Sequence, residues 1–221
     1  MRARNESLTR LWDDLLARLA GTRHHLRRDL GSVALTFDDG PDPDFTPLVL
    51  DALSTAGIRA TFFFVGRHAS AHPELVVRAK AEGHSIGTHS QSHMSADGAR
   101  PRALIDDYRS GRACVEKILG CPVRLFRPPQ GRISPAAAWA LRRLSLDVWL
   151  WTLNTEDWRP ETTTDTILQR TAAIEPGDVV LLHDGTAHPG PEMDSDRSAT
   201  VAAVERIVGL VHGRGLTFAA L

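Results

Sequence analysis

The chain has 221 residues, of which 42% are hydrophobic and 24% are charged, and its formal net charge is −1. This length fits one α/β domain with a full hydrophobic core and leaves little room for a second domain. The near-zero charge provides no basic field to gather nucleic acid, and no apolar run is long enough to cross a bilayer, so we expect neither nucleic-acid binding nor membrane insertion.

Residues 1–30 are predicted to form an N-terminal helical segment that precedes a main domain at 31–221. Apolar side chains three and four residues apart indicate a short amphipathic helix packed on the outside of the core. They are Leu8, Leu11, Trp12, Leu15, Leu16 and Leu19. The segment lacks the uninterrupted apolar stretch and cleavage site of a secretory signal, and we therefore expect a cytoplasmic protein.

From residue 32 onward, short apolar or β-branched runs alternate with segments of helical periodicity. The predicted strands are 33–37, 60–65, 84–86, 123–126, 146–151, 178–182 and 216–218. The predicted helices are 44–56, 73–82, 101–119, 135–144, 163–174 and 197–213. Seven strands alternating with helices predict a parallel sheet, either closed as a (β/α) barrel one unit short of eight or open and doubly wound.

Polar side chains follow most of these strands directly. Because catalytic groups of parallel βα folds lie at the carboxyl ends of the strands, we expect these side chains to converge on one rim. In chain order they are Asp38 and Asp39, His89 and His93, Arg127, Asp157 and Trp158, and His183 and Asp184.

His89 and His93 lie four residues apart in HSQSH, a spacing that can bring two imidazoles onto one ion. With one carboxylate they make a two-histidine, one-carboxylate site that leaves positions open for water and substrate. The adjacent Asp38 and Asp39 cannot occupy the same place, since successive side chains at a strand end point in different directions. The residues alone do not say which of the two binds the metal.

Five ordered motifs resemble those of the polysaccharide deacetylase family, the NodB-homology carbohydrate esterases. They are TFDDGP at 36–41, HSQSH at 89–93, FRPPQG at 126–131, the DW of NTEDW at 154–158, and LLH at 181–183. The resemblance spans about 32–219. It implies a single-domain, distorted (β/α)7 barrel with parallel strands, which agrees with the strand count.

The resemblance also implies a role for each motif residue. Asp39, His89 and His93 would hold one divalent metal ion, with Zn²⁺ expected and Co²⁺, Ni²⁺, Mn²⁺ or Fe²⁺ as alternatives. Asp38 would be the general base, Arg127 its tether, His183 the general acid, and Asp157 the partner that orients His183. The substrate-binding residues would be Pro129, Gln130, Trp158 and Leu181.

Two positions depart from the family pattern. Gln130 stands where the third motif commonly has Tyr, and Asn154 stands where the fourth commonly has an acidic residue. Both changes fall on the rim of the predicted site. The loop after His183, from Gly185 to Arg197, either shapes the substrate cleft or is a plain surface connection.

Other aromatic side chains match no motif. Trp139, Trp149 and Trp151 are predicted to be core aromatics, and the remaining seven histidines to be structural or exposed. These are His24, His25, His68, His72, His84, His188 and His212.

The predicted function is a metal-dependent hydrolase that removes N-acetyl groups from an amino sugar or oligosaccharide. The alternatives are a sugar O-acetyl esterase of the same family, a catalytically silent carbohydrate-binding barrel, and a non-haem iron oxygenase built on the same ligand triad. A complete set of base, ligands, tether and acid argues against a binding module. An acidic residue ahead of the HxxxH pair, with a separate acid and base, fits hydrolysis better than oxygenation. The sequence specifies no oligomeric state.

Overall fold

Strand β1 (Ser32–Asp38) lies in the middle of the sheet and is buried along its whole length. In the computed structural model, which describes residues 15–188 and 193–221, β1 pairs with β2 (Thr61–Phe64) on one side and β7 (Val179–His183) on the other. All ladders between the described strands are parallel. The sheet continues through β3 (Ser85–Thr88), β4 (Leu125–Phe126) and β5 (Asp147–Val148) beyond β2, β6 (Leu153–Asn154) beyond β7, and β8 (Thr217–Phe218) beside the start of β1.

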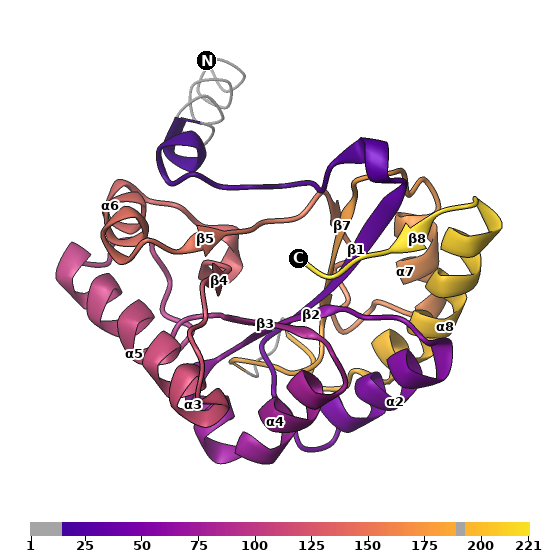
Figure 1. The fold of residues 1–221 in the computed structure, drawn as a ribbon, viewed down its shortest axis with the longest axis horizontal. Coiled ribbons are helices and arrows are strands. Elements are labelled where there is room, and N and C mark those ends of the chain that lie inside the picture. Colours follow the sequence, from indigo (N-terminus) through magenta and orange to yellow (C-terminus); the bar gives the residue numbers. More distant parts are fainter. Residues whose placement is uncertain (1–14, 189–192) are drawn as a thin grey trace.

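Helices cover the outside of this curved sheet (Figure 1). Prolines stand in the first turn of several of them, and the Ser134 hydroxyl caps one by accepting from the Ala137 N–H at 3.2 Å. The α-helices that follow β1 are α2 (Thr46–Ala56), α3 (Gly66–Ala71), α4 (Pro73–Ala81), α5 (Pro101–Leu119), α6 (Pro135–Leu144), α7 (Thr164–Thr171) and α8 (Ser198–Gly213), and two 3₁₀ turns are η1 (Arg28–Leu30) and η2 (Pro129–Gly131). The predicted single-domain, distorted (β/α)7 barrel is confirmed.

The predicted strand at 146–151 is wrong in its second half. Strand β5 ends at Val148, Trp149 forms an isolated parallel bridge with Arg23, and β6 begins only at Leu153. The Arg23 N–H donates to the Val148 carbonyl at 2.9 Å, and the Leu26 N–H donates to the Gly177 carbonyl at 2.8 Å. The segment at 23–26, which crosses the open side of the sheet in Figure 1, therefore bridges the end of β5 and the turn that precedes β7.

Other boundaries also differ from the sequence prediction. Helix α3 was not predicted, since its six residues, GRHASA, are too few to show helical periodicity. Helix α7 ends at Thr171 instead of 174. Of the N-terminal helix, residues 15–19 are helical, and Leu16 packs against the cluster around α6, while Leu8, Leu11 and Trp12 lie outside the described residues.

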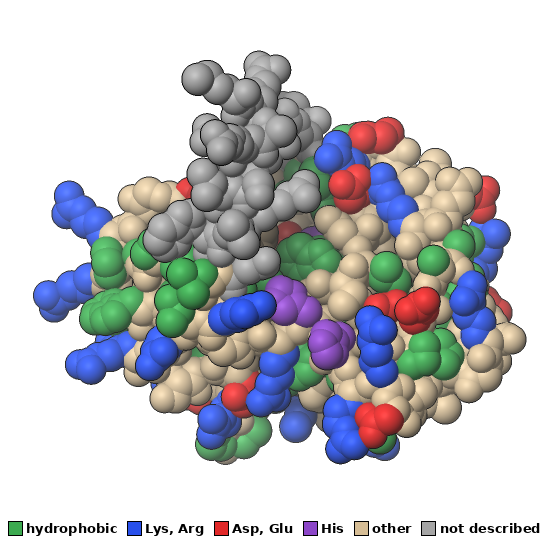
Figure 2. Space-filling model, turned by 90° about the horizontal axis from the view of Figure 1, so that it is seen from above, with side chains coloured by type: hydrophobic (Ala, Val, Ile, Leu, Met, Phe, Trp, Pro, Cys, Tyr) green, Lys and Arg blue, Asp and Glu red, His purple; other side chains and the backbone are tan. Residues whose placement is uncertain are grey.

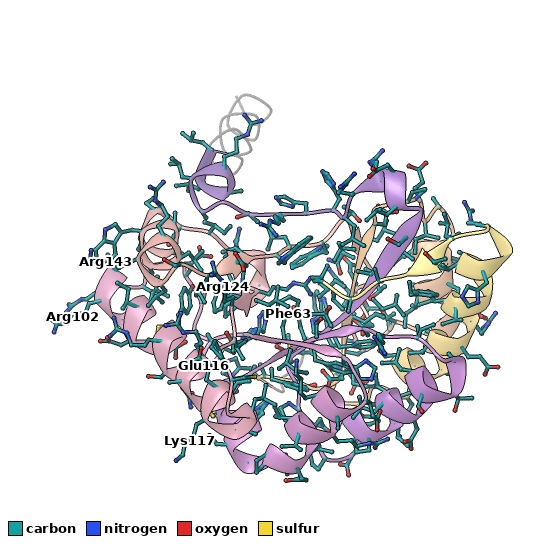
Figure 3. The ribbon with its side chains drawn as sticks, viewed as in Figure 1. Phe63, Arg102, Glu116, Lys117, Arg124 and Arg143 are labelled. Atoms are coloured by element: carbon teal, nitrogen blue, oxygen red, sulfur yellow. The ribbon has the colours of Figure 1, made fainter. Side chains whose placement is uncertain are left out.

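Aromatic side chains of β2 point alternately to the two faces of the sheet, as the period of a strand requires. Phe62 and Phe64 lie in the core between sheet and outer helices, and Phe62 stacks on Phe37 with ring centroids 5.2 Å apart. Phe63 points into the barrel interior, while Arg102 and Lys117 of α5 project outward (Figure 3). Trp149 is a core residue as predicted, but the prediction for Trp139 is wrong, because its side chain on α6 is 52% exposed.

On the face shown in Figure 2, Lys and Arg outnumber Asp and Glu in the left half, whereas both signs are mixed in the right half. In the described part of the chain, no helix is long and apolar enough to cross a membrane.

We expect Phe62→Ala to lower the free energy of unfolding by about 3–5 kcal/mol, since it opens a cavity in a close-packed core. Trp139→Ala, an equally drastic truncation of an exposed aromatic, should cost less than about 1 kcal/mol. Urea denaturation of both variants measures the difference. Equal losses would mean that the aromatic cluster between β1, β2 and the helices is not the main core.

Candidate metal centre and active site

Asp39, His89 and His93 come together at the carboxyl ends of β1 and β3. Their candidate ligand atoms all lie within 4.8 Å of one another, and all three residues are buried. Asp39 Oδ1 lies 3.3 Å from His93 Nε2 and 3.6 Å from His89 Nε2, yet it has no hydrogen-bond partner. A buried carboxylate oxygen facing two imidazole nitrogens in this way fits a bound cation.

The protonation of the two histidines also suits a metal. His89 Nδ1 lies 2.7 Å from the Arg127 carbonyl oxygen, which can only accept, so Nδ1 carries a hydrogen, and in the neutral tautomer Nε2 is the nitrogen that presents a lone pair. Burial lowers the pKa of His93 to about 3, which keeps that ring neutral. Burial by itself would raise the pKa of Asp39, but His93, His183, His89 and the Ala187 N–H bring it below its ordinary value.

In the turn that carries Asp39, the backbone at Gly40 lies very close to the side chain of Asp184. A Cβ on Gly40 would lie 2.3 Å from Asp184 Oδ2, so only glycine fits against that carboxyl group. Burial raises the pKa of Asp184 to about 7, and Thr46 donates to it at 2.5 Å. Asp39 itself has a φ of 73°, an uncommon conformation for a residue other than glycine. The surrounding contacts thus fix a strained turn at this candidate metal ligand.

A carboxylate on α5 holds the HSQSH loop in place through hydrogen bonds. Asp107 accepts from the Gln91 N–H at 3.2 Å, from the Ser92 N–H at 3.1 Å and from the Ser92 hydroxyl at 2.6 Å. The loop also lies directly on Gly111, where a Cβ would be 2.4 Å from the Ser90 carbonyl carbon. A role for Asp107 could not be predicted, because nothing near it in the chain indicates which loop it contacts.

Asp38 and Arg127 form a fully buried ion pair. Arg127 Nη1 donates to Asp38 Oδ1 at 2.8 Å and to the Thr36 hydroxyl at 2.8 Å. The remaining guanidinium nitrogens donate to the carbonyls of Trp149 and Leu150, at 3.2 and 3.0 Å. The predicted contact between Asp38 and Arg127 is present, and Asp38 Oδ2 stays free of this clamp.

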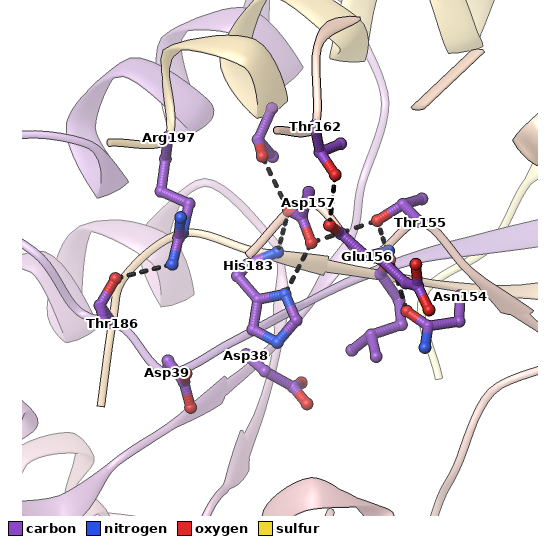
Figure 4. Close-up of polar contacts among 12 residues, drawn as sticks. Asp38, Asp39, Asn154, Thr155, Glu156, Asp157, Thr162, His183, Thr186 and Arg197 are labelled. Carbon is purple, nitrogen blue, oxygen red and sulfur yellow. Dashed lines mark hydrogen bonds and ion pairs between the residues drawn. The ribbon is translucent and has the colours of Figure 1, made fainter. Parts of the chain in front are cut away.

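His183 and Asp157 form a second buried pair (Figure 4). His183 Nδ1 lies 2.7 Å from Asp157 Oδ1, while the His183 backbone N–H and the Thr200 hydroxyl donate to Asp157 Oδ2 at 2.8 and 2.7 Å. Figure 4 shows the imidazole extending from Asp157 toward Asp38 and Asp39. Burial by itself would lower the pKa of His183, but the charge and hydrogen bond of Asp157 raise it above its ordinary value.

These groups border a cavity of about 430 Å³. Gln130, Trp158 and Leu181 line it as predicted, whereas Pro129 is buried in η2 and is not among the lining residues. Arg132, Trp151 and Met193 also line it and were not predicted to do so. Met193 and the Ala187 N–H, 3.3 Å from Asp39 Oδ2, show that the loop after His183 shapes the cleft.

The sequence did not indicate that Trp151 borders the cavity, because this residue lies inside a predicted strand. Its indole packs over Gly131, where a Cβ would lie 2.6 Å away, and it borders the cavity as a half-buried side chain. Asn154 also lines the cavity, and its Oδ1 accepts from the Glu156 N–H at 3.0 Å. An aspartate could accept the same bond, so the departure at Asn154 preserves the turn and changes only the charge on the rim.

Two of the histidines that match no motif contact the three candidate metal ligands. His68 Nδ1 lies 2.7 Å from the Asp39 carbonyl oxygen, and the exposed ring of His188 meets that of His93 edge-on at 5.4 Å between centroids. The other described ones keep a structural or surface position, such as His84 against the ring of Phe62.

Residues 26–149 match the family model described as polysaccharide deacetylase. The chain belongs to the polysaccharide deacetylase family. A peptidoglycan-N-acetylglucosamine deacetylase of Bacillus cereus is 36% identical over 188 residues, covering 84% of each chain. A chitooligosaccharide deacetylase of Sinorhizobium fredii is 37% identical over 201 residues, covering 86% of this chain and 90% of the relative.

Solved structures of this family share the fold. The crystal structure of the Bc1960 peptidoglycan N-acetylglucosamine deacetylase superposes with a TM-score of 0.81 at 29% identity, covering 90% of each chain. The expectation of a distorted barrel of this deacetylase family is therefore confirmed by sequence and by structure.

We expect Asp157→Asn to lower the pKa of His183, because the variant keeps the burial that disfavours the imidazolium and loses the charge that favours it. His183 should therefore lose its proton at a lower pH in the variant than in the unsubstituted protein. An NMR titration of the ring nitrogens measures this, with Asp165→Asn, an exposed carboxylate paired with Arg206, as the control. An unchanged His183 titration in Asp157→Asn would show that Asp157 does not set its charge.

Proposed function

We propose that this protein hydrolyses N-acetyl groups from amino sugar units of an oligosaccharide or polysaccharide, using one divalent ion, Zn²⁺ in the first instance. The observation that carries the proposal is the pairing of Asp38 with His183 in register on neighbouring strands, beside the Asp39, His89 and His93 group. A base and an acid are thereby available on either side of one reacting carbon. The named activities of the Bacillus cereus and Sinorhizobium fredii relatives support an N-acetylated sugar as substrate.

Asp39, His89 and His93 would hold the ion. When bound there, the ion supplies Lewis-acid chemistry, which polarises the acyl carbonyl and lowers the pKa of water. The imidazole nitrogens of His89 and His93, the latter in a neutral ring, and the unpartnered Asp39 Oδ1 are the donor types that such an ion requires.

Asp38 is suited to take the proton of the attacking water. Arg127 fixes its Oδ1 through a hydrogen bond of 2.8 Å, which orients the carboxylate. Its Oδ2 is the oxygen on the side of the metal group, 3.7 Å from His89 Nε2. The proton acceptor is thus held in place before substrate binds, which is what general-base catalysis requires.

His183 is suited to give a proton to the departing nitrogen. With Nδ1 bound to Asp157, Nε2 is the nitrogen left to donate, and the raised pKa keeps the ring protonated at higher pH. An amine is a poor leaving group unless it is protonated, so a held imidazolium favours amide hydrolysis. The substrate would lie in the cavity that Gln130, Trp151, Trp158 and Leu181 line together with the acid.

The assay that tests the proposal compares acetate release from N-acetylated chitooligosaccharides and from O-acetylated xylooligosaccharides. We expect release with a matching free amine from the first substrate, loss of that activity after a chelator removes the metal, and its return with Zn²⁺ or Co²⁺. Acetate released only from the ester would instead identify an O-acetyl esterase. No release from either substrate by the metal-loaded protein, with tight sugar binding, would identify a binding barrel.

A further inference from the structure

Arg197 is a fully buried guanidinium that the site described above does not use. In the described part of the chain, no carboxylate lies within ion-pair distance of it. Taking such a charge out of water is costly unless hydrogen bonds satisfy it. The bonds that do so all go to one loop: Nε donates to the Gly185 carbonyl at 3.0 Å, Nη2 to the Thr186 hydroxyl at 2.7 Å, and Nη1 to the Asp196 carbonyl at 3.0 Å.

Thr186 extends this contact to the other limb of the loop. Its hydroxyl accepts from Arg197, as Figure 4 shows, and donates to the Asp194 carbonyl at 3.1 Å. The Asp194 N–H in turn donates to the carbonyl of Trp158, a residue lining the cavity, at 3.0 Å. Arg197 therefore fixes the start and the end of the loop against each other at the edge of the cavity.

The residues directly after Thr186 touch two of the three candidate metal ligands. The Ala187 N–H donates to Asp39 Oδ2 at 3.3 Å, and Arg67 donates to the Ala187 carbonyl. The His188 ring meets the His93 ring at 5.4 Å. Because Ala187 holds Oδ2 of Asp39, Oδ1 is left facing His89 and His93.

We propose that Arg197 is a positioning residue that, through Thr186, holds residues 185–188 against Asp39 and His93 and so sets the metal affinity of the site. The inference rests on the proposed function only in assuming that this group binds a divalent ion. Groups that hydrogen-bond to a metal ligand and orient it typically contribute about 10- to 100-fold to the affinity for the metal, and we expect an effect of this size here.

The test measures Co²⁺ affinity by competition with a chelator, without substrate. Thr186→Val removes the hydroxyl at nearly constant volume and should weaken binding by about 10- to 100-fold, while Thr186→Ser should restore it. Arg197→Lys should weaken it as well, since an ammonium cannot reach three acceptors set around a planar guanidinium. Arg206→Gln, at an exposed arginine of α8, the helix that begins directly after Arg197, is the control and should bind like the unsubstituted protein.

A purely structural role for Arg197 predicts a different pattern. The Thr186→Val and Arg197→Lys variants would then unfold at lower temperature. At temperatures where circular dichroism shows them to be folded, they would bind Co²⁺ as tightly as the unsubstituted protein. That result would overturn the proposal. Failure of the proposed function is distinguishable. A protein that binds Co²⁺ with the expected variant effects but releases no acetate would refute the deacetylase and leave the role of Arg197 intact.

Discussion

Two adjacent carboxylates, Asp38 and Asp39, are buried at the end of the central strand, each about 2% exposed. Neighbouring like charges without water destabilise one another and the fold, so each must be compensated by its own partner. Asp38 has the Arg127 guanidinium at 2.8 Å. Among the described residues, the basic side chains within ion-pair distance of Asp39 are imidazoles, and burial keeps one of them, His93, neutral. This imbalance makes the Asp39 side the place where a cation would be stabilised most.

The other buried polar residues of the site neutralise or hydrogen-bond these two carboxylates and their partners. Arg127 reaches from the end of β4 to β1 and to the carbonyls at 149 and 150, and its own carbonyl fixes the tautomer of His89. One residue thus orients the proposed base and one proposed ligand together. On the other side, Asp157 holds the proposed acid, His183, and is itself satisfied by Thr155 and Thr200. Buried polar networks make a site rigid where their members are paired.

The βα alternation and the residues at the strand ends could be predicted, because hydrophobic periodicity and motif spacing are local in the chain. What the sequence did not reveal are contacts between distant segments. Asp107 supports a loop 15 and 16 residues before it, and the segment at 23–26, which has no strand pattern, fills the edge of the sheet beside Trp149. Trp151 was assigned to the core because a strand was expected to continue through it. The strand ends at Val148 instead, and the indole borders the cavity.

The most direct test of this account separates the two neighbouring carboxylates by metal content and turnover on an N-acetylated chitooligosaccharide. Asp39→Asn should lose most of its metal, since it removes the anionic ligand. Asp38→Asn should keep the metal and lose about 10²- to 10⁴-fold in turnover, the usual contribution of a general base. Metal lost from Asp38→Asn but retained by Asp39→Asn would contradict the account by reversing the two roles, and near-normal turnover in both variants would remove the pair from the mechanism.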